Sequence, residues 1–167
     1  MSNNTQHPFE SALVQSLVEN GGYTLGDAST YSKELGFFRD EIIRFLKASQ
    51  PSRWAKIESV HDADVENRVL QRLYKEMDLR GSLDVLRNGF TDYGVRFQMA
   101  YFQPASGLNP DAVDLYNQNS LKVYRQIYYS KDNKNSIDVL LSLNGIPVAT
   151  LELKNQFTGQ NVNNALK

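Results

Sequence analysis

Three charged side chains stand in the two most apolar segments of the chain. Asp138 lies within SIDVLLSL, and Glu152 and Lys154 lie within ATLELKN. Burying a carboxylate or an ammonium group in a sheet is costly unless the group is paired or binds a metal. Two carboxylates offer the hard oxygen ligands that Mg²⁺ prefers, and the lysine follows one step along the same strand face. The three residues therefore predict a Mg²⁺ site that could activate water against a phosphate ester.

The turn between the two segments decides whether these side chains can meet. Asn144-Gly145 between two apolar runs is a strong hairpin signal. A two-residue turn would make Asp138 face away from Glu152. We expect instead a three-residue loop ending at a left-handed Gly145, which places Asp138 opposite Thr150 and diagonal to Glu152. This register also collects the apolar residues of both strands on the other face, which independently favours it.

The pattern has a second interpretation. Many strands end in Glu-x-Lys only because their ends are solvated, so the spacing by itself favours neither a site nor an ordinary exposed end. What favours a site is that all three charges belong to apolar strands on either side of the Asn-Gly turn. Asp138 and Glu152 are then the metal ligands, and Lys154 orients the attacking water or stabilises charge that develops on the phosphate.

The composition excludes several other chemistries. The chain has 167 residues, 41% hydrophobic and 22% charged, as in an ordinary globular domain. It has no cysteine and two histidines, which excludes disulfides and cysteine nucleophiles and argues against a zinc site. Its formal net charge is -1, whereas a dedicated DNA-binding module is usually basic. Without a leader or a membrane-length apolar run, we expect a cytoplasmic chain that makes no membrane contact.

The spacing of apolar residues predicts helices in the first half of the chain and strands in the second. Helices are expected over 9–18, 35–46 and 65–77, and strands over 95–101, 123–129, 136–143 and 146–154. This order predicts an α+β fold, a mixed β-sheet flanked by helices with an N-terminal helical segment. We expect one domain over 1–167, with a helical insert at about 27–80 and a sheet core at about 81–167. Because the chain stops just after a helix predicted to start near Thr158, we expect a fragment of a longer protein.

The segment SIDVLLSLNGIPVATLELKNQFTGQ resembles the nuclease motif of the motor (restriction) subunit of type I restriction-modification enzymes, in the PD-(D/E)xK superfamily. The resemblance extends in the family's order to FESALVQSLVENGGY, FLKASQPSRW, VLRNGF, YFQPASGLNP and NSLKVYRQIYYS. It implies a restriction-endonuclease-like fold that cleaves double-stranded DNA endonucleolytically with Mg²⁺. Asp138 and Glu152 match the motif's acids, Lys154 its lysine, and Glu10 an acid often placed beside the metal. Ile137 stands where the motif has proline.

The resemblance also implies partners and limits. Sequence recognition and methylation would belong to separate specificity and methylation subunits. By the resemblance, the family's Gln-x-x-x-Tyr element and its ATP-driven translocase domains would lie beyond Lys167. We therefore expect ATP to bind only the full-length chain, and we expect the fragment's own cleavage to be weak or absent.

Other residues and functions remain open. Arg125 and Gln126 in YRQIYY are candidate contacts to the DNA backbone, although an ordinary solvated strand face is an equal alternative. Gln160, at the start of the last predicted helix, is a third candidate contact to the DNA backbone. By composition alone, Glu10 would be a solvated helix residue. Two other functions fit the sequence: a structure-specific repair nuclease that uses the same site, and a non-catalytic docking or DNA-clamping module without metal affinity.

Overall fold

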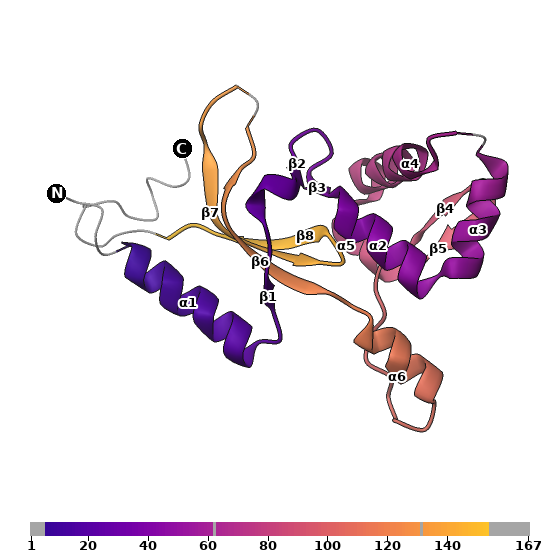
Figure 1. Cartoon of the computed structure of the whole chain (residues 1–167), viewed down its shortest axis with the longest axis horizontal. Helices are drawn as coiled ribbons and strands as arrows, with labels where there is room; N and C mark the ends of the chain where they lie inside the picture. The colour runs from indigo at the N-terminus through magenta and orange to yellow at the C-terminus, as the bar shows by residue number, and fades with distance from the viewer. Residues whose placement is uncertain (1–5, 62, 131, 154–167) are drawn as a thin grey trace.

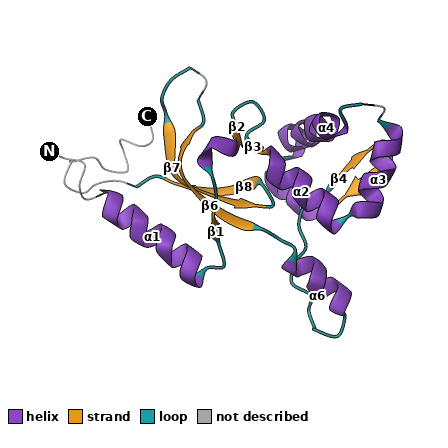
Figure 2. Cartoon of the chain, in the orientation of Figure 1, coloured by secondary structure: helices purple, strands orange, loops and turns teal. Residues whose placement is uncertain are grey.

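A four-stranded mixed sheet forms the centre of the protein in the computed structural model, which describes residues 6–61, 63–130 and 132–153. Its strand order is β1-β6-β7-β8, made of Thr24–Leu25, Leu121–Tyr128, Ser136–Leu143 and Ile146–Leu151. β1 runs parallel to β6, and the other neighbours are antiparallel. Figures 1 and 2 show α1 (Gln6–Asn20) beside this sheet and a group of helices at the sheet's far end. The expected α+β class is confirmed.

The group of helices has its own apolar core. It contains α2 (Arg39–Ser49), α3 (Pro51–Val60), α4 (Val65–Arg80) and α5 (Ser82–Asn88), with a small hairpin of β4 (Phe90–Asp92) and β5 (Val95–Phe97). Buried members of this core include Ile42, Leu46, Trp54, Ile57, Leu70, Leu73 and Phe97. Pro51 occupies the first turn of α3, where its missing N–H costs nothing. α4 ends at Gly81, whose φ of 81° suits a helix end.

Several elements differ from the sequence-based expectation. The strand expected over 95–101 ends at Phe97 and pairs only with β4, in a two-stranded sheet apart from the main one. α5 and α6 (Pro110–Asn117) were not expected, because each is too short to show a helical period. α6 did have a local signal, since the Asn109 side chain accepts from the Ala112 N–H and Pro110 follows it. The helix expected near Thr158 lies outside the described residues.

The two faces of the sheet bury different elements. On one face α1 packs through Val14 against Val123 and Val139. The opposite face is covered by the segment that holds η1 (Ala28–Thr30), β2 (Tyr31–Ser32) and β3 (Phe37–Phe38). There the Tyr124 ring stacks on Phe38 with centroids 3.7 Å apart, and burial raises the pKa of Tyr124 to about 12. No helix in the described part of the chain is long and apolar enough to cross a bilayer.

Gly26 allows the close approach of this covering segment to the sheet. A Cβ at Gly26 would lie 2.1 Å from Cε1 of Tyr124. We expect Gly26→Ala to lower the free energy of unfolding by about 1–3 kcal/mol, because the ring is held between Gly26 and Phe38 and cannot yield easily. Urea denaturation measures this loss. Gly107→Ala is the control, since a Cβ there would meet no atom within 4 Å; an equal loss in both variants would contradict the packing argument.

Candidate metal centre

The candidate centre begins on α1, where Glu10 shares a helix stripe with the residues that pack on the sheet. Glu10, Val14 and Leu17 follow one another at helical spacing, so all three side chains face β6 and β7. Glu10 is 1% exposed. The expectation from composition, a solvated helix residue, is therefore wrong, and a buried carboxylate lies against the sheet.

An ion pair neutralises this buried carboxylate. Arg125 on β6 donates from Nε to Oε1 of Glu10 over 2.6 Å. The same guanidinium donates from Nη2 to Oγ of Ser11 over 3.3 Å. Burial of a charged group is tolerated when the group is paired, and the Arg125 guanidinium supplies the partner of Glu10.

β6 is irregular beside this pair. Gln126 has a φ of 52°, which is uncommon for a residue other than glycine. Val123 packs on the α1 face, yet Ile127, four positions later, packs on the opposite face. In a regular strand residues four apart share a face, so the left-handed residue reverses the alternation.

The reversal brings Gln126 between the two acids. Its Nε2 lies 3.4 Å from Oε2 of Glu10 and 3.4 Å from Oδ1 of Asp138. Both distances are at the long end of the hydrogen-bond range, as expected for one amide shared by two acceptors. Gln126 thus bridges α1 and β7 and holds the two carboxylates on either side of its amide group.

The register of the β7–β8 hairpin differs from the expected one. The turn is a two-residue turn in which Leu143 pairs with Ile146, so the expected three-residue loop is wrong. Asn144 and Gly145 have φ values of 52° and 87°, which suit the type I′ turn that joins twisted strands. Thr150 accordingly pairs with Leu140 and not with Asp138.

A β-bulge within the hairpin brings Asp138 and Glu152 to opposite positions on the two strands. The register shifts between Leu141 and Ser142, which pair with Ala149 and Pro147, so Val148 is the extra residue. Proline cannot donate to the ladder and is found at edge strands and bulges, and β8 is an edge strand. Past the bulge Val139 pairs with Leu151, and one further step of this register places Asp138 opposite Glu152.

A backbone contact fixes Asp138 at that position. The Leu153 N–H donates to Oδ2 of Asp138 over 2.7 Å. The adjacent residue, Glu152, is exposed, as a ligand open to a substrate would be. The structure therefore brings Glu10, Gln126 and Asp138 together, with Glu152 next to the Leu153 contact. Lys154 and Gln160 lie outside the described residues.

The donor set fits a hydrated Mg²⁺ ion. Among the described residues no three acidic or histidine side chains converge closely enough to hold a metal ion by themselves. Mg²⁺ keeps several of its waters and is commonly bound through one or two carboxylates and a substrate phosphate, so a full protein cage is not required. Asp138 and Glu152, which the register of the hairpin places opposite one another, are the two carboxylates that could hold such an ion.

Sequence reasoning missed what Arg125 and Gln126 do here. It suggested either contacts to the DNA backbone or an ordinary solvated strand face, and it did not foresee that both side chains bind acids of the candidate centre. The spacing of Glu10, Val14 and Leu17 was a usable signal that Glu10 faces the sheet. The left-handed conformation of Gln126 had no such signal, because no residue type in YRQIYY marks a position with positive φ.

Comparison with families of known proteins identifies the family of this chain. The family model for the type I restriction enzyme R protein N terminus matches residues 9–167. No curated protein matches the chain, and no solved structure does. Because the match extends over nearly the whole sequence, and over all of α1 except its first turn, this chain belongs to the family of type I restriction enzyme R protein N-terminal domains.

Proposed function

We propose that this chain is a nuclease domain that cleaves double-stranded DNA with Mg²⁺, within a complex that also holds specificity and methylation subunits. The observation that carries the proposal is the bridge of Gln126 between the carboxylates of Glu10 and Asp138. The bulge that aligns Asp138 with Glu152 supports it. Family membership supports a restriction function in the coarser sense.

In this proposal each residue has a distinct part. Bound Mg²⁺ would polarise the scissile phosphate and lower the pKa of a bound water. Asp138 and Glu152 would hold the ion, while the Leu153 N–H at Oδ2 and the Gln126 amide at Oδ1 keep the Asp138 carboxylate in one orientation. Gln126 sets the spacing of Asp138 and Glu10. Lys154 would orient the water or stabilise negative charge on the phosphate.

One observation favours a second candidate, a non-catalytic docking or DNA-clamping module. The Arg125 guanidinium already neutralises Glu10, so the contact between α1 and the sheet is electrostatically complete without a metal. In that case the same residues would serve only to fix α1 on the sheet, and the acids would have no measurable metal affinity.

Calorimetric titration of Mg²⁺ or Mn²⁺ into the 167-residue chain separates the two candidates. We expect the wild-type chain to bind one of these ions, and we expect Asp138→Asn and Glu152→Gln each to weaken binding by at least about tenfold, because each removes a charged ligand. Circular dichroism checks that the variants fold. Glu19→Gln and Asp132→Asn, at exposed acids away from the centre, are matched controls.

Two results would count against the nuclease proposal. Unchanged affinity in Asp138→Asn and Glu152→Gln would mean that the hairpin acids are not the ligands. A wild-type chain that binds neither ion would favour the docking module. Equal weakening by the control variants would show only a general effect of charge.

A further inference from the structure

A polar pocket lies at the end of the molecule opposite α1. Its volume is about 750 Å³, and it is formed between α4 and the turn that joins β4 to β5. Figure 1 shows these elements far from α1 across the length of the sheet. The side chains that matter to its chemistry are His61, Arg68, Gln71, Lys75, Asp92 and Tyr93.

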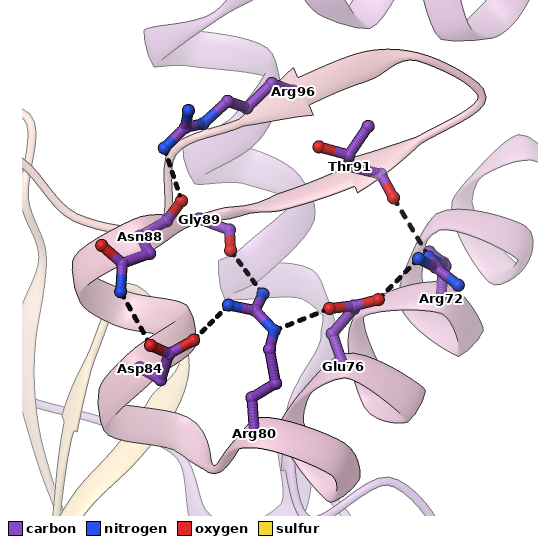
Figure 3. Close-up of polar contacts among 8 residues, drawn as sticks. All are labelled: Arg72, Glu76, Arg80, Asp84, Asn88, Gly89, Thr91 and Arg96. Carbon is purple, nitrogen blue, oxygen red and sulfur yellow. Dashed lines mark hydrogen bonds and ion pairs between the residues drawn. The ribbon is translucent and has the colours of Figure 1, made fainter.

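A polar frame holds the two walls of this pocket together. Figure 3 shows Arg72 of α4 donating to the Thr91 carbonyl oxygen, over 3.0 Å, while it also pairs with Glu76. Arg80 continues the frame, donating to Glu76 over 2.8 Å and to the Gly89 carbonyl oxygen over 2.7 Å. The β4–β5 hairpin is therefore fixed against α4, and the pocket between them is preformed.

Two cations on the α4 wall are available to a ligand. Arg68 and Lys75 stand seven residues apart, on the helix face that also carries Arg72. Both are exposed, and neither has an ion-pair partner among the described residues. Gln71 between them is also exposed and makes no side-chain hydrogen bond within the described part of the chain.

The acidic side chains of the pocket are already engaged. Asp92 lies 3.0 Å from Nε2 of His61, and both side chains are buried. Asp64 accepts from the Asn67 amide over 2.6 Å. Arg68 and Lys75 outnumber Asp64, whose hydrogen bond to a neutral amide leaves its charge uncompensated, so the exposed charge of the pocket is positive on balance. The other ring nitrogen of His61, Nδ1, makes no hydrogen bond to a described residue.

Tyr93 adds an aromatic surface to the rim. Asp92 pairs with Val95, so Tyr93 and Gly94 form a two-residue turn with φ values of 43° and 78°. The first position of such a turn favours Asn, Asp or Gly, and a tyrosine there is strained. Tyr93 as a whole is 71% exposed, so burial does not offset this strain. The Tyr93 ring meets the His61 ring edge to face, with the ring centroids 5.1 Å apart. Much of the Tyr93 side chain therefore remains open for stacking.

We propose that this pocket binds a nucleoside phosphate, either as a free nucleotide or as one unit of a single nucleic-acid strand. The phosphate would lie against Arg68 and Lys75, and the base would stack on Tyr93 with Gln71 within reach of its edge. Cations beside an exposed aromatic ring are the usual arrangement for such ligands. The inference does not depend on the nuclease proposal, because it uses none of the residues of the candidate metal centre.

The test measures binding to the 167-residue chain in EDTA, so that no metal-dependent cleavage intervenes. Probes are a fluorescein-labelled oligothymidylate, the matching duplex, AMP and polyglutamate, with amide chemical shifts to place each one. We expect Arg68→Glu with Lys75→Glu to weaken strand binding by at least about tenfold. We expect Tyr93→Asn, which removes the ring but suits the turn, to weaken it by about fivefold or more.

Lys56→Glu with Arg87→Glu is the matched control, because it changes the net charge equally at exposed residues outside the pocket. We expect the control to weaken strand binding by less than about threefold, since only general attraction is lost. AMP that binds as well as the strand would identify a free nucleotide, and a much tighter strand would identify nucleic acid. Shifts should fall on Asn67–Lys75 and Thr91–Gly94.

Four results would overturn the proposal. These are no saturable binding of AMP or strand, shifts that avoid the pocket, equal losses in the two double variants, and polyglutamate competing as well as the strand. A duplex that binds as tightly as the strand, with Tyr93→Asn unaffected, would also exclude stacking on this ring.

Discussion

Asp138→Asn should reduce DNA cleavage by a complete restriction complex by at least about a thousandfold, because the substitution removes a charged ligand of the proposed Mg²⁺ ion while the chain keeps its shape. The asparagine can still accept from the Leu153 N–H and fill the same space beside Gln126, so the fold of the hairpin should survive. Conversion of supercoiled plasmid to linear product measures cleavage. A mobility-shift assay on the same complex should show DNA affinity changed by less than about twofold, because the substitution removes none of the lysine and arginine side chains that attract DNA phosphates.

A matched substitution keeps this prediction specific. Asp132→Asn removes the same charge from the exposed segment between β6 and β7 and should cleave like wild type. Cleavage retained by Asp138→Asn would exclude Asp138 as a ligand and, with it, the proposed centre. Loss of both cleavage and DNA binding would instead indicate that Asp138 acts through the structure of the complex.

Gln126 is a residue that positions the acids and does not itself ligate a metal in the proposed centre. Its amide is the common donor to Glu10 and Asp138, and its left-handed backbone places it there. Strained conformations of this kind persist where the surrounding structure holds them, and here the ladder of β6 with β7 continues on both sides of Gln126. The strain is therefore located in the candidate centre itself.

The α+β class and the helices α1 and α4 followed from apolar spacing and from the glycine that ends each helix, although in α1 Phe9 and Val18 are exposed and Val14 is the buried apolar residue. α5 and α6 did not, since seven or eight residues give too few turns to establish a period. The β4–β5 hairpin alternates like a strand of the main sheet, but it packs on helices, and only the tertiary fold decides which sheet a short strand joins.

The meeting of Asp138 with the β8 end was expected for a reason that proved wrong. One extra residue in the hairpin was needed to turn Asp138 and Glu152 to the same face. We expected it in the turn that ends at Gly145, and the structure has it at Val148. Pro147 was the signal for that position, because a residue without an N–H interrupts the ladder one step after the turn. The separation of apolar from polar residues on the two strand faces indicated that the register shifts. The missing N–H of Pro147 indicated where the shift lies.

Asn144→Ala should lower the free energy of unfolding by at least about 3 kcal/mol, because it leaves buried polar groups unpaired at a residue with positive φ. Asn144 is fully buried, with 0% exposure. Its Oδ1 accepts from the Ser120 N–H over 2.7 Å, and its Nδ2 donates to the Met99 carbonyl oxygen over 3.0 Å and to Oδ1 of Asn119 over 2.9 Å. The side chain thus joins the hairpin turn to two other segments.

Urea denaturation of the 167-residue chain measures this loss as a lower midpoint at an unchanged m-value. Asn144→Gly separates its two causes, because glycine removes the same hydrogen bonds without strain at a φ of 52°. We expect the glycine variant to be about 1 kcal/mol more stable than the alanine variant. Asn117→Ala, at an exposed residue of α6, should change stability by less than about 0.5 kcal/mol.

The same substitution tests whether the turn sets the geometry of the distant acids. The Phe38 N–H donates to the Gly145 carbonyl oxygen over 2.9 Å, so the turn is fixed to the start of α2, and the register of β7 and β8 is counted from there. If Asn144→Gly folds but the turn loosens, the alignment of Asp138 with the chain after β8 should weaken, and metal affinity should fall with it. Wild-type affinity in a folded Asn144→Gly chain would mean that the bulge at Val148 alone maintains the alignment.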